Sequence, residues 1–184
     1  MSRTPPRILA VETLASTRHF RVEAVDLMFS NGAAARFERL RGSTAGAVLI
    51  VPVRDPDHVL LIREYAAGTE RYELGLPKGR IENDEPVLDA ALRELREETG
   101  QGAAELTYLT TLSSNPAYSG QRTHIVLAES LYPAPLAGDE PEPIEVEPWP
   151  VEQIDRLLAG GEFTEARSLA ALFLVRDLLR SRQQ

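Results

Sequence analysis

The sequence contains no cysteine among its 184 residues. This absence excludes disulfide bonds, thiolate-bound zinc and catalysis by a thiol nucleophile, and it fits a cytoplasmic location. No apolar run approaches the roughly 20 residues of a membrane-spanning helix. The N-terminal residues Met-Ser-Arg-Thr-Pro-Pro have no apolar stretch behind them. We therefore expect neither a membrane span nor a signal peptide.

Basic residues are outnumbered by acidic ones, with 20 Lys and Arg against 28 Asp and Glu and a net charge of −8. Proteins that bind nucleic acid usually carry a basic stripe, and none is present, so nucleic acid is not an expected partner. An acidic protein can still bind a polyanion when divalent cations neutralise the contact. The length and the 43% of hydrophobic residues are typical of one main globular domain.

The N-terminal part of the chain reads as strands joined by turns. Residues 20–27 alternate in part between apolar and polar side chains, and Asn31-Gly32 is a hairpin signal. We expect about three antiparallel strands in a separate unit over residues 1–43. The alternative, that these are extra strands of the main sheet, stays open.

Residues 44–184 predict a domain of the α+β class. Its clearest element is a helix between Pro86 in its first turn and Gly100 at its exit, after a loop over residues 68–86. The apolar stripe of this helix is Leu88, Ala91, Leu92 and Leu95. Other expected elements are strands at 45–53, 59–63, 105–112 and 123–128, a short strand before 150, and helices at 152–158 and from 164 onward.

Three glutamates, Glu94, Glu97 and Glu98, share one face of this helix because their spacing is i, i+3 and i+4. Like charges at this spacing destabilise a helix, so an offsetting partner is expected. Hard divalent cations prefer carboxylate oxygens. The alternative is a solvated face paired with Arg93 and Arg96.

The surroundings favour the metal interpretation. Residues 79–101 resemble the Nudix box, G-x5-E-x7-R-E-U-x-E-E-x-G-U, where U is a bulky apolar residue. The matching positions are Gly79, Glu85, Arg93, Glu94, Leu95, Glu97, Glu98 and Gly100. Gln101 departs from the pattern at a packing position. The resemblance implies a Nudix α/β/α sandwich with a mixed sheet, and hydrolysis of a diphosphate linkage.

The resemblance also implies a role for each box residue. Glu94 and Glu98 would be the principal Mg²⁺ ligands, Glu97 would share a second ion and act in catalysis, and the backbone carbonyl of Lys78 would complete the site. Mn²⁺ is an expected substitute.

The remaining box residues are expected to be structural. Glu85 and Arg93 would brace the loop against the helix. Gly79 would supply backbone freedom for a tight turn, and Gly100 would end the helix.

Features outside the Nudix box indicate which group of Nudix hydrolases the chain resembles. Pro116, in Ser114-Asn115-Pro116-Ala117-Tyr118, and the extra N-terminal sheet resemble the ADP-ribose pyrophosphatase group, where that sheet builds a swapped dimer. From Ile8 to Leu179 the chain is similar to the bacterial ADP compounds hydrolases. The segments that carry this likeness are 11–13, 29–32, 61–66, 68–70, 72–75, 138–143, 165–167 and 171–176.

This likeness implies a homodimer and small nucleotide substrates. Those substrates would be ADP-ribose, NADH and adenosine-based dinucleoside polyphosphates, with AMP as a common product. A Nudix hydrolase of nucleotide sugars and a Nudix module that senses a nucleotide without cleaving it remain alternatives.

The general base and the substrate contacts are further expectations. In the related group a late-loop glutamate is the base; here Glu142 is the first candidate and Glu140 the second. Arg63 is a candidate phosphate clamp and Glu73 a candidate ribose ligand. Phe20 would either stack on adenine or pack in a core.

Overall fold

The computed structural model describes residues 4–43, 45–82, 84–138 and 140–182. By their contacts these residues form two compact units. The N-terminal unit runs up to Gly46 and includes Ser113–Arg122, and the main unit holds Ala47–Leu112 and the chain from Thr123 onward. Reading the sequence did not anticipate that residues 113–122 belong with the N-terminal unit.

The N-terminal unit is built on a three-stranded antiparallel sheet of β1 (Arg7–Ser16), β2 (Arg21–Met28) and β3 (Ala34–Leu40), in that order. Gly32 takes the left-handed conformation that the β2–β3 turn requires, with φ of 83°. Asn31 supports the turn because its side-chain oxygen accepts a hydrogen bond from the Ala33 amide at 3.0 Å. The expectation of a separate antiparallel sheet is confirmed.

The main unit holds a mixed seven-stranded sheet. Its path is β10-β5-β4-β9-β8, with β6 paired to β5 and β7 paired to β4. Strand β4 runs parallel to β9 and antiparallel to β5 and β7. The strands are β4 (Ala47–Asp55), β5 (His58–Ala66), β6 (Arg71–Gly75), β7 (Lys78–Arg80), β8 (Gln101–Ser113), β9 (Arg122–Pro133) and β10 (Glu145–Pro150).

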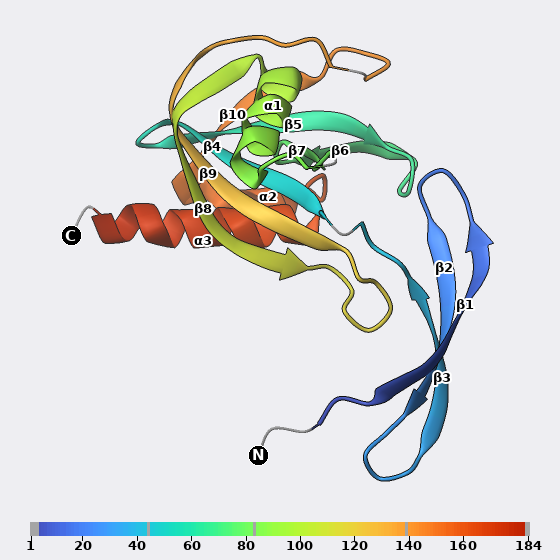
Figure 1. Ribbon diagram of the computed structural model, residues 1–184. Helices are drawn as coiled ribbons and strands as arrows, with labels where there is room; N and C mark the ends of the chain where they lie inside the picture. Colours follow the sequence, from blue (N-terminus) through green and yellow to red (C-terminus); the bar gives the residue numbers. More distant parts are fainter. Residues whose placement is uncertain (1–3, 44, 83, 139, 183–184) are drawn as a thin grey trace. The chain divides into compact units, whose positions relative to one another are not determined.

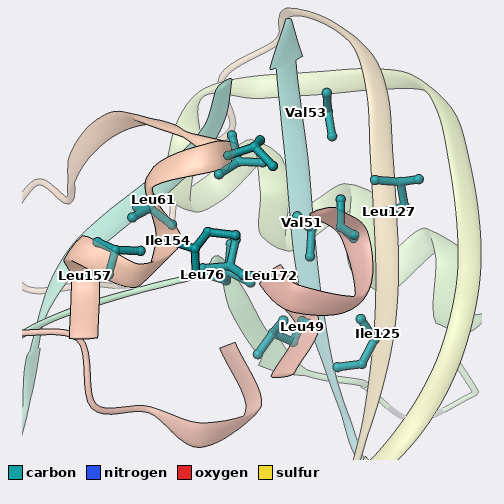
Figure 2. Packing of buried hydrophobic residues seen from close by; sticks show 14 of the residues in the cluster. Leu49, Val51, Val53, Leu61, Leu76, Ile125, Leu127, Ile154, Leu157 and Leu172 are labelled. Atoms are coloured by element: carbon teal, nitrogen blue, oxygen red, sulfur yellow. The ribbon is translucent and has the colours of Figure 1, made fainter. Parts of the chain in front are cut away.

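Helices cover both faces of this sheet (Figure 1). Helix α1 (Val87–Thr99) packs against β4 and β7, and α3 (Ala166–Arg182) packs against β4 on the other face, beside η1 (Val151–Gln153) and α2 (Ile154–Gly160). Figure 2 shows the core under α2 and α3, where Leu49, Leu61 and Leu172 are among the packed side chains. The expected Nudix α/β/α sandwich is confirmed.

Strand β4 serves both layers because successive side chains of a strand point to opposite faces. Leu49, Val51 and Val53 belong to the core under α2 and α3. Val48 and Ile50 are equally inaccessible and face α1. No helix in the described parts of the chain is long and apolar enough to cross a membrane.

Three expectations about local structure are wrong. The segment 68–86 is not one loop, because it contains the short strands β6 and β7. The buried side of α1 also differs from the predicted stripe. Leu88 is exposed, and the buried set is Ala90, Ala91, Glu94, Leu95 and Glu98. Helix α1 begins after Pro86, which acts as its N-cap rather than lying in its first turn.

Candidate active site

Helix α1 buries two of its glutamates against the sheet. Glu94 and Glu98 lie one turn apart and are only 8% and 5% exposed. Glu97, on the neighbouring part of the helix surface, is partly buried. Two carboxylates in one buried position are unfavourable unless opposite charge compensates them. Positive charge close to this pair would therefore stabilise it.

Burial dominates the electrostatics of both carboxyl groups. It raises the pKa of Glu98 to about 8, although the positive charge and the backbone amide of Lys78 act in the opposite direction. Burial also raises the pKa of Glu94, opposed by hydrogen bonding to Arg93. The charges of Glu97 and Glu140 raise the pKa of Glu94 further, so both lie within electrostatic range of it.

Arg93, on the same helix, forms hydrogen bonds with three glutamates of the Nudix-box segment. Its guanidinium donates to Glu85 at 2.9 and 3.0 Å, to Glu94 at 2.8 Å and to Glu97 at 2.9 Å. It also donates to the backbone carbonyl of Arg80 at 2.9 Å, which joins α1 to β7. These contacts raise the pKa of Arg93 far above its ordinary value, so the group stays charged.

Gly79 makes room for Glu94. A Cβ at this position would lie 2.0 Å from the Glu94 carboxyl carbon. The expectation of backbone freedom at Gly79 is wrong, since the residue lies in β7 and does not adopt a positive φ. The backbone freedom is used at Gly100, where φ of 70° ends α1 and the amide donates to the carbonyl of Arg96 at 3.1 Å.

Lys78 connects β7 to the buried carboxylates. Its amide donates to Glu98 Oε2 at 2.8 Å, and its ammonium donates to Glu64 Oε2 at 2.9 Å. Glu64 was not among the residues predicted from the sequence. It lies 14 positions before Lys78, and the only local signal for it was its place beside Arg63 in the segment 61–66. Its negative charge raises the pKa of Glu98.

The residues present fit a divalent cation by the chemistry of their donors. Buried carboxylate oxygens are hard ligands, and the space opposite Gly79 holds one of them. Over residues 4–43, 45–82, 84–138 and 140–182, no three His, Asp or Glu side chains already converge on one point. Glu94 and Glu98 instead accept hydrogen bonds from Arg93 and from the Lys78 amide. Each carboxylate has further lone pairs through which it would bind a cation.

The loop between β9 and β10, called the late loop below, carries two further carboxylates near α1. A cavity of about 500 Å³ is bordered by Glu97 and Glu98 of the helix and by Glu140 and Glu142 of the loop. Glu142 accepts a hydrogen bond from the hydroxyl of Tyr72 at 2.5 Å. That contact raises the pKa of Tyr72, so the phenol remains the donor. Both candidate bases therefore lie beside the glutamates of α1.

Arg63 is engaged by carboxylates rather than free for a ligand. Its guanidinium lies 3.1 Å from Glu162, 3.8 Å from Glu145 and 3.7 Å from Glu147. Arg63 lies two residues after Leu61 of the core under α2 and α3, so it shares that face of β5. A phosphate at Arg63 would have to replace these partners.

Glu73 borders a second cavity, of about 450 Å³. Its carboxylate accepts hydrogen bonds from Arg71 at 2.9 Å and from Thr164 at 3.1 Å, and Arg71 lowers its pKa.

Pro116 belongs to the N-terminal unit, where it borders a cavity of about 330 Å³. Phe20 is 63% exposed, so the alternative of a core role for it is wrong.

Comparisons with known proteins agree with this geometry. The NUDIX domain model matches residues 43–172, and the model of the NudE-type Nudix hydrolase N-terminal domain matches residues 6–39. The chain is 53% identical over 175 residues to the ADP compounds hydrolase NudE of Escherichia coli (strain K12), covering 95% of this chain and 94% of that protein. It is 28% identical over 174 residues to an ADP-ribose pyrophosphatase of Bacillus subtilis (strain 168), covering 94% and 93%.

A solved structure, a crystal structure of an ADP compounds hydrolase, superimposes with a TM-score of 0.92 at 51% identity. It covers 99% of this chain and 98% of its own. Nudix hydrolases generally use divalent metals, as the buried glutamates of α1 predict. The whole-chain likeness that the sequence predicted is thereby confirmed, and the chain belongs to the Nudix hydrolase family.

Proposed function

We propose that this enzyme hydrolyses the diphosphate linkage of ADP-containing compounds such as ADP-ribose, NADH and diadenosine polyphosphates, and releases AMP. The observation that carries the proposal is the pair of buried carboxylates, Glu94 and Glu98, beside β7. The ADP compounds hydrolase that is 53% identical over nearly its whole length supports the substrate class.

Glu94 and Glu98 would hold Mg²⁺ together with the backbone carbonyl of Lys78, and Glu97 would share a second ion. When bound, the cation supplies positive charge to the diphosphate oxygens of the substrate. Arg93 holds Glu94 and Glu97 in register by its hydrogen bonds. Mn²⁺ is expected to replace Mg²⁺ because both accept hard oxygen ligands.

The general base in this proposal is Glu142, with Glu140 as the second candidate. The carboxylate takes a proton from a water molecule as the water oxygen bonds to phosphorus. The bridging P–O bond breaks on the other side, so that ADP-ribose and water yield AMP and ribose 5-phosphate. The Tyr72 hydroxyl holds Glu142 by a hydrogen bond, which supports the first choice.

The contacts to the rest of the substrate are part of the same proposal. Glu73 would bind a ribose hydroxyl, because its carboxylate borders the 450 Å³ cavity on β6. Arg63 as a phosphate clamp and Pro116 as a substrate-binding residue remain expectations from the resemblance. The absence of cysteine supports a reducing, cytoplasmic location, and the net charge of −8 argues against nucleic acid as a partner.

AMP release from ADP-ribose, NADH and diadenosine triphosphate, with and without Mg²⁺, tests the function. Magnesium-dependent AMP from all three is the expected result. Strong preference for a UDP- or GDP-sugar would instead assign a nucleotide-sugar hydrolase. Tight binding of ADP-ribose without turnover with any divalent metal would assign a sensor module.

A further inference from the structure

Lys78 is the only lysine in the sequence. The other 19 of the 20 Lys and Arg residues are arginine. Arginine accordingly supplies the cation in other ion pairs of the main unit, such as Arg182 with Glu129 and Arg180 with Glu152. A lysine that served only to pair with Glu64 has no evident advantage over arginine there. The exception at position 78 therefore points to a chemical requirement for an ammonium group.

Lys78 contacts two features of the site. Its backbone amide donates a hydrogen bond to Glu98. Its side chain borders the 450 Å³ cavity together with Glu64, Thr69, Glu73 and Ser168. The pairing of Lys78 with Leu49 in the β4–β7 ladder fixes the backbone from which this side chain leaves. Figure 1 shows β7 beside α1, and the two elements are in contact.

The position of the ammonium is defined before any substrate arrives. Glu64 holds it at 2.9 Å, and the Lys78 side chain keeps 30% of its exposure, so one side remains open to a ligand. Lys78 also lies close enough to Glu98 for its charge to lower the pKa of that carboxyl group. A ligand on the buried carboxylates of α1 would therefore lie near this cation.

The chemistry of the two basic side chains distinguishes the roles. An ammonium is a compact point charge with three donors on a flexible stem, whereas a guanidinium is a wide planar fork. A point charge suits a phosphate oxygen that is already crowded by other ligands. An arginine at position 78 would place a wider group between Glu64 and Glu98.

We propose that the ammonium of Lys78 binds a phosphate oxygen of the substrate's diphosphate, and that Glu64 holds the side chain in position for this contact. The inference rests on the diphosphate hydrolase function proposed above. The resemblance gave a role only to the backbone carbonyl of Lys78. The proposal gives its side chain a contact with the substrate.

The first test compares variants in the turnover of ADP-ribose with Mg²⁺. Lys78→Met is expected to lower kcat/KM about 10- to 100-fold, the range for loss of a charge-assisted hydrogen bond. Lys78→Arg should restore only part of this loss. Arg182→Met removes a cation from the Glu129 pair, away from the site, and should leave kcat/KM within about twofold of the wild-type value. Thermal unfolding of each variant checks that it is folded.

Glu64→Gln separates substrate binding from a simple ion pair. If Lys78 serves only Glu64, then Lys78→Met and Glu64→Gln should have equal effects on turnover. The proposal requires the loss in Lys78→Met to be the larger by about tenfold. Equal effects, or near-wild-type turnover in Lys78→Met, would overturn it.

The second test uses the wild-type protein, so it does not depend on a variant that folds. Because Lys78 carries the only side-chain amine, trinitrobenzenesulfonate modifies only this side chain and the α-amino group of the chain, which serves as the internal reference. We expect α,β-methylene-ADP with Mg²⁺ to slow modification of Lys78 several-fold relative to Mg²⁺ alone, as measured by mass spectrometry. An unchanged rate at saturating probe would contradict the contact.

The two proposals fail in different ways. If the wild-type enzyme releases AMP but Lys78 is neither protected nor needed, only the role of Lys78 is wrong. If the wild-type enzyme cleaves no ADP compound, the proposed function is wrong, and protection of Lys78 by α,β-methylene-ADP then decides phosphate binding by itself.

Discussion

Glu98 illustrates at the residue scale how position changes the chemistry of an ordinary side chain. The same helix presents Asp89 to solvent and Glu98 to the sheet. Burial raises the pKa of Glu98 to about 8, so the carboxyl group is mostly protonated at neutral pH in the absence of a cation. A bound divalent cation would favour the ionised form, which links metal binding to proton release.

Glu98→Gln is predicted to lower magnesium-dependent turnover about 100- to 1,000-fold. The amide keeps the shape of the side chain and its acceptor oxygen for the Lys78 amide, but it removes the negative charge. Circular dichroism should show a folded protein. Asp89→Asn, an exposed position on α1, is the matched control and should keep wild-type turnover. Near-normal turnover of Glu98→Gln at saturating Mg²⁺ would refute the metal assignment.

The pKa of Glu98 predicts a pH dependence of stability in the presence of EDTA. A carboxyl group with a raised pKa binds its proton more tightly when folded, so it lowers stability as the pH rises. The window runs from the ordinary glutamate value, about 4.3, to about 8. The unfolding free energy of the wild type, minus that of Glu98→Gln, should fall as the pH rises through this window. The expected slope is up to about 1.4 kcal/mol per pH unit.

Urea unfolding of both proteins at several pH values from 5 to 8 measures this difference. Using the difference cancels the other titrating groups that the two proteins share. A flat difference across the window would mean that Glu98 is ionised in the folded protein without metal.

Gly79→Ala is predicted to destabilise the protein by about 1–3 kcal/mol and to reduce turnover strongly. The new methyl group would lie 2.0 Å from the carboxyl carbon of Glu94, which would have to move away. Gly160→Ala in α2 is the matched control because its Cβ meets no atom within 4 Å. Chemical unfolding and the ADP-ribose assay measure both effects. If Gly79→Ala behaves like Gly160→Ala, the close approach of Glu94 to β7 is wrong.

At the element scale, two short strands position several of the candidate site residues. Strand β6 carries Tyr72 and Glu73, and β7 carries Lys78 and Gly79. Each is held by a longer neighbour, since β6 pairs with β5 and β7 pairs with β4. The ring of Tyr72 also packs edge-on against Tyr65 of β5, with centroids 5.6 Å apart. The strand thus fixes the hydroxyl that reaches Glu142 in the late loop.

Tyr72→Phe is predicted to lower kcat about tenfold and to change KM little, because the variant releases Glu142 but keeps the aromatic packing. Glu142→Gln should lower kcat about 100- to 10,000-fold if it is the base. In that case the two changes are not additive, since Tyr72 acts through Glu142. A normal kcat in Glu142→Gln with a large loss in Glu140→Gln would move the base to Glu140.

At the scale of the whole molecule, the N-terminal unit displays apolar side chains along β1. Ile8, Leu9, Val11 and Leu14 are all more than one-third exposed. We keep the prediction that residues 1–43 form a dimerisation unit of a homodimer, since an apolar strand left in water favours association.

Val11→Lys is predicted to shift the full-length protein from dimer to monomer, because it places a charge in the middle of this strand. Light scattering coupled to size exclusion measures the mass against 20.3 kDa for one chain. Glu38→Gln, an exposed change on β3, raises the net charge by the same one unit and controls for the change in charge. A wild-type mass of one chain at micromolar concentration would refute the homodimer.

The sequence alone determined the family, the reaction class and the glutamates of α1. These follow from a pattern with fixed spacing in 23 consecutive residues, and one helix suffices to interpret it. The expected hairpin unit and the helices after residue 150 also depend on local signals, namely turn residues and apolar periodicity.

Only the tertiary structure decided which α1 residues are buried, because the sheet covers Glu94 and Glu98 and leaves Leu88 exposed. It also decided the pairs Glu64–Lys78 and Tyr72–Glu142, which are 14 and 70 positions apart. Strands of five and three residues carry too little periodicity to be recognised alone, and they form because β5 and β4 supply their hydrogen-bond partners. Contacts that depend on strand register and on a distant loop require the folded chain.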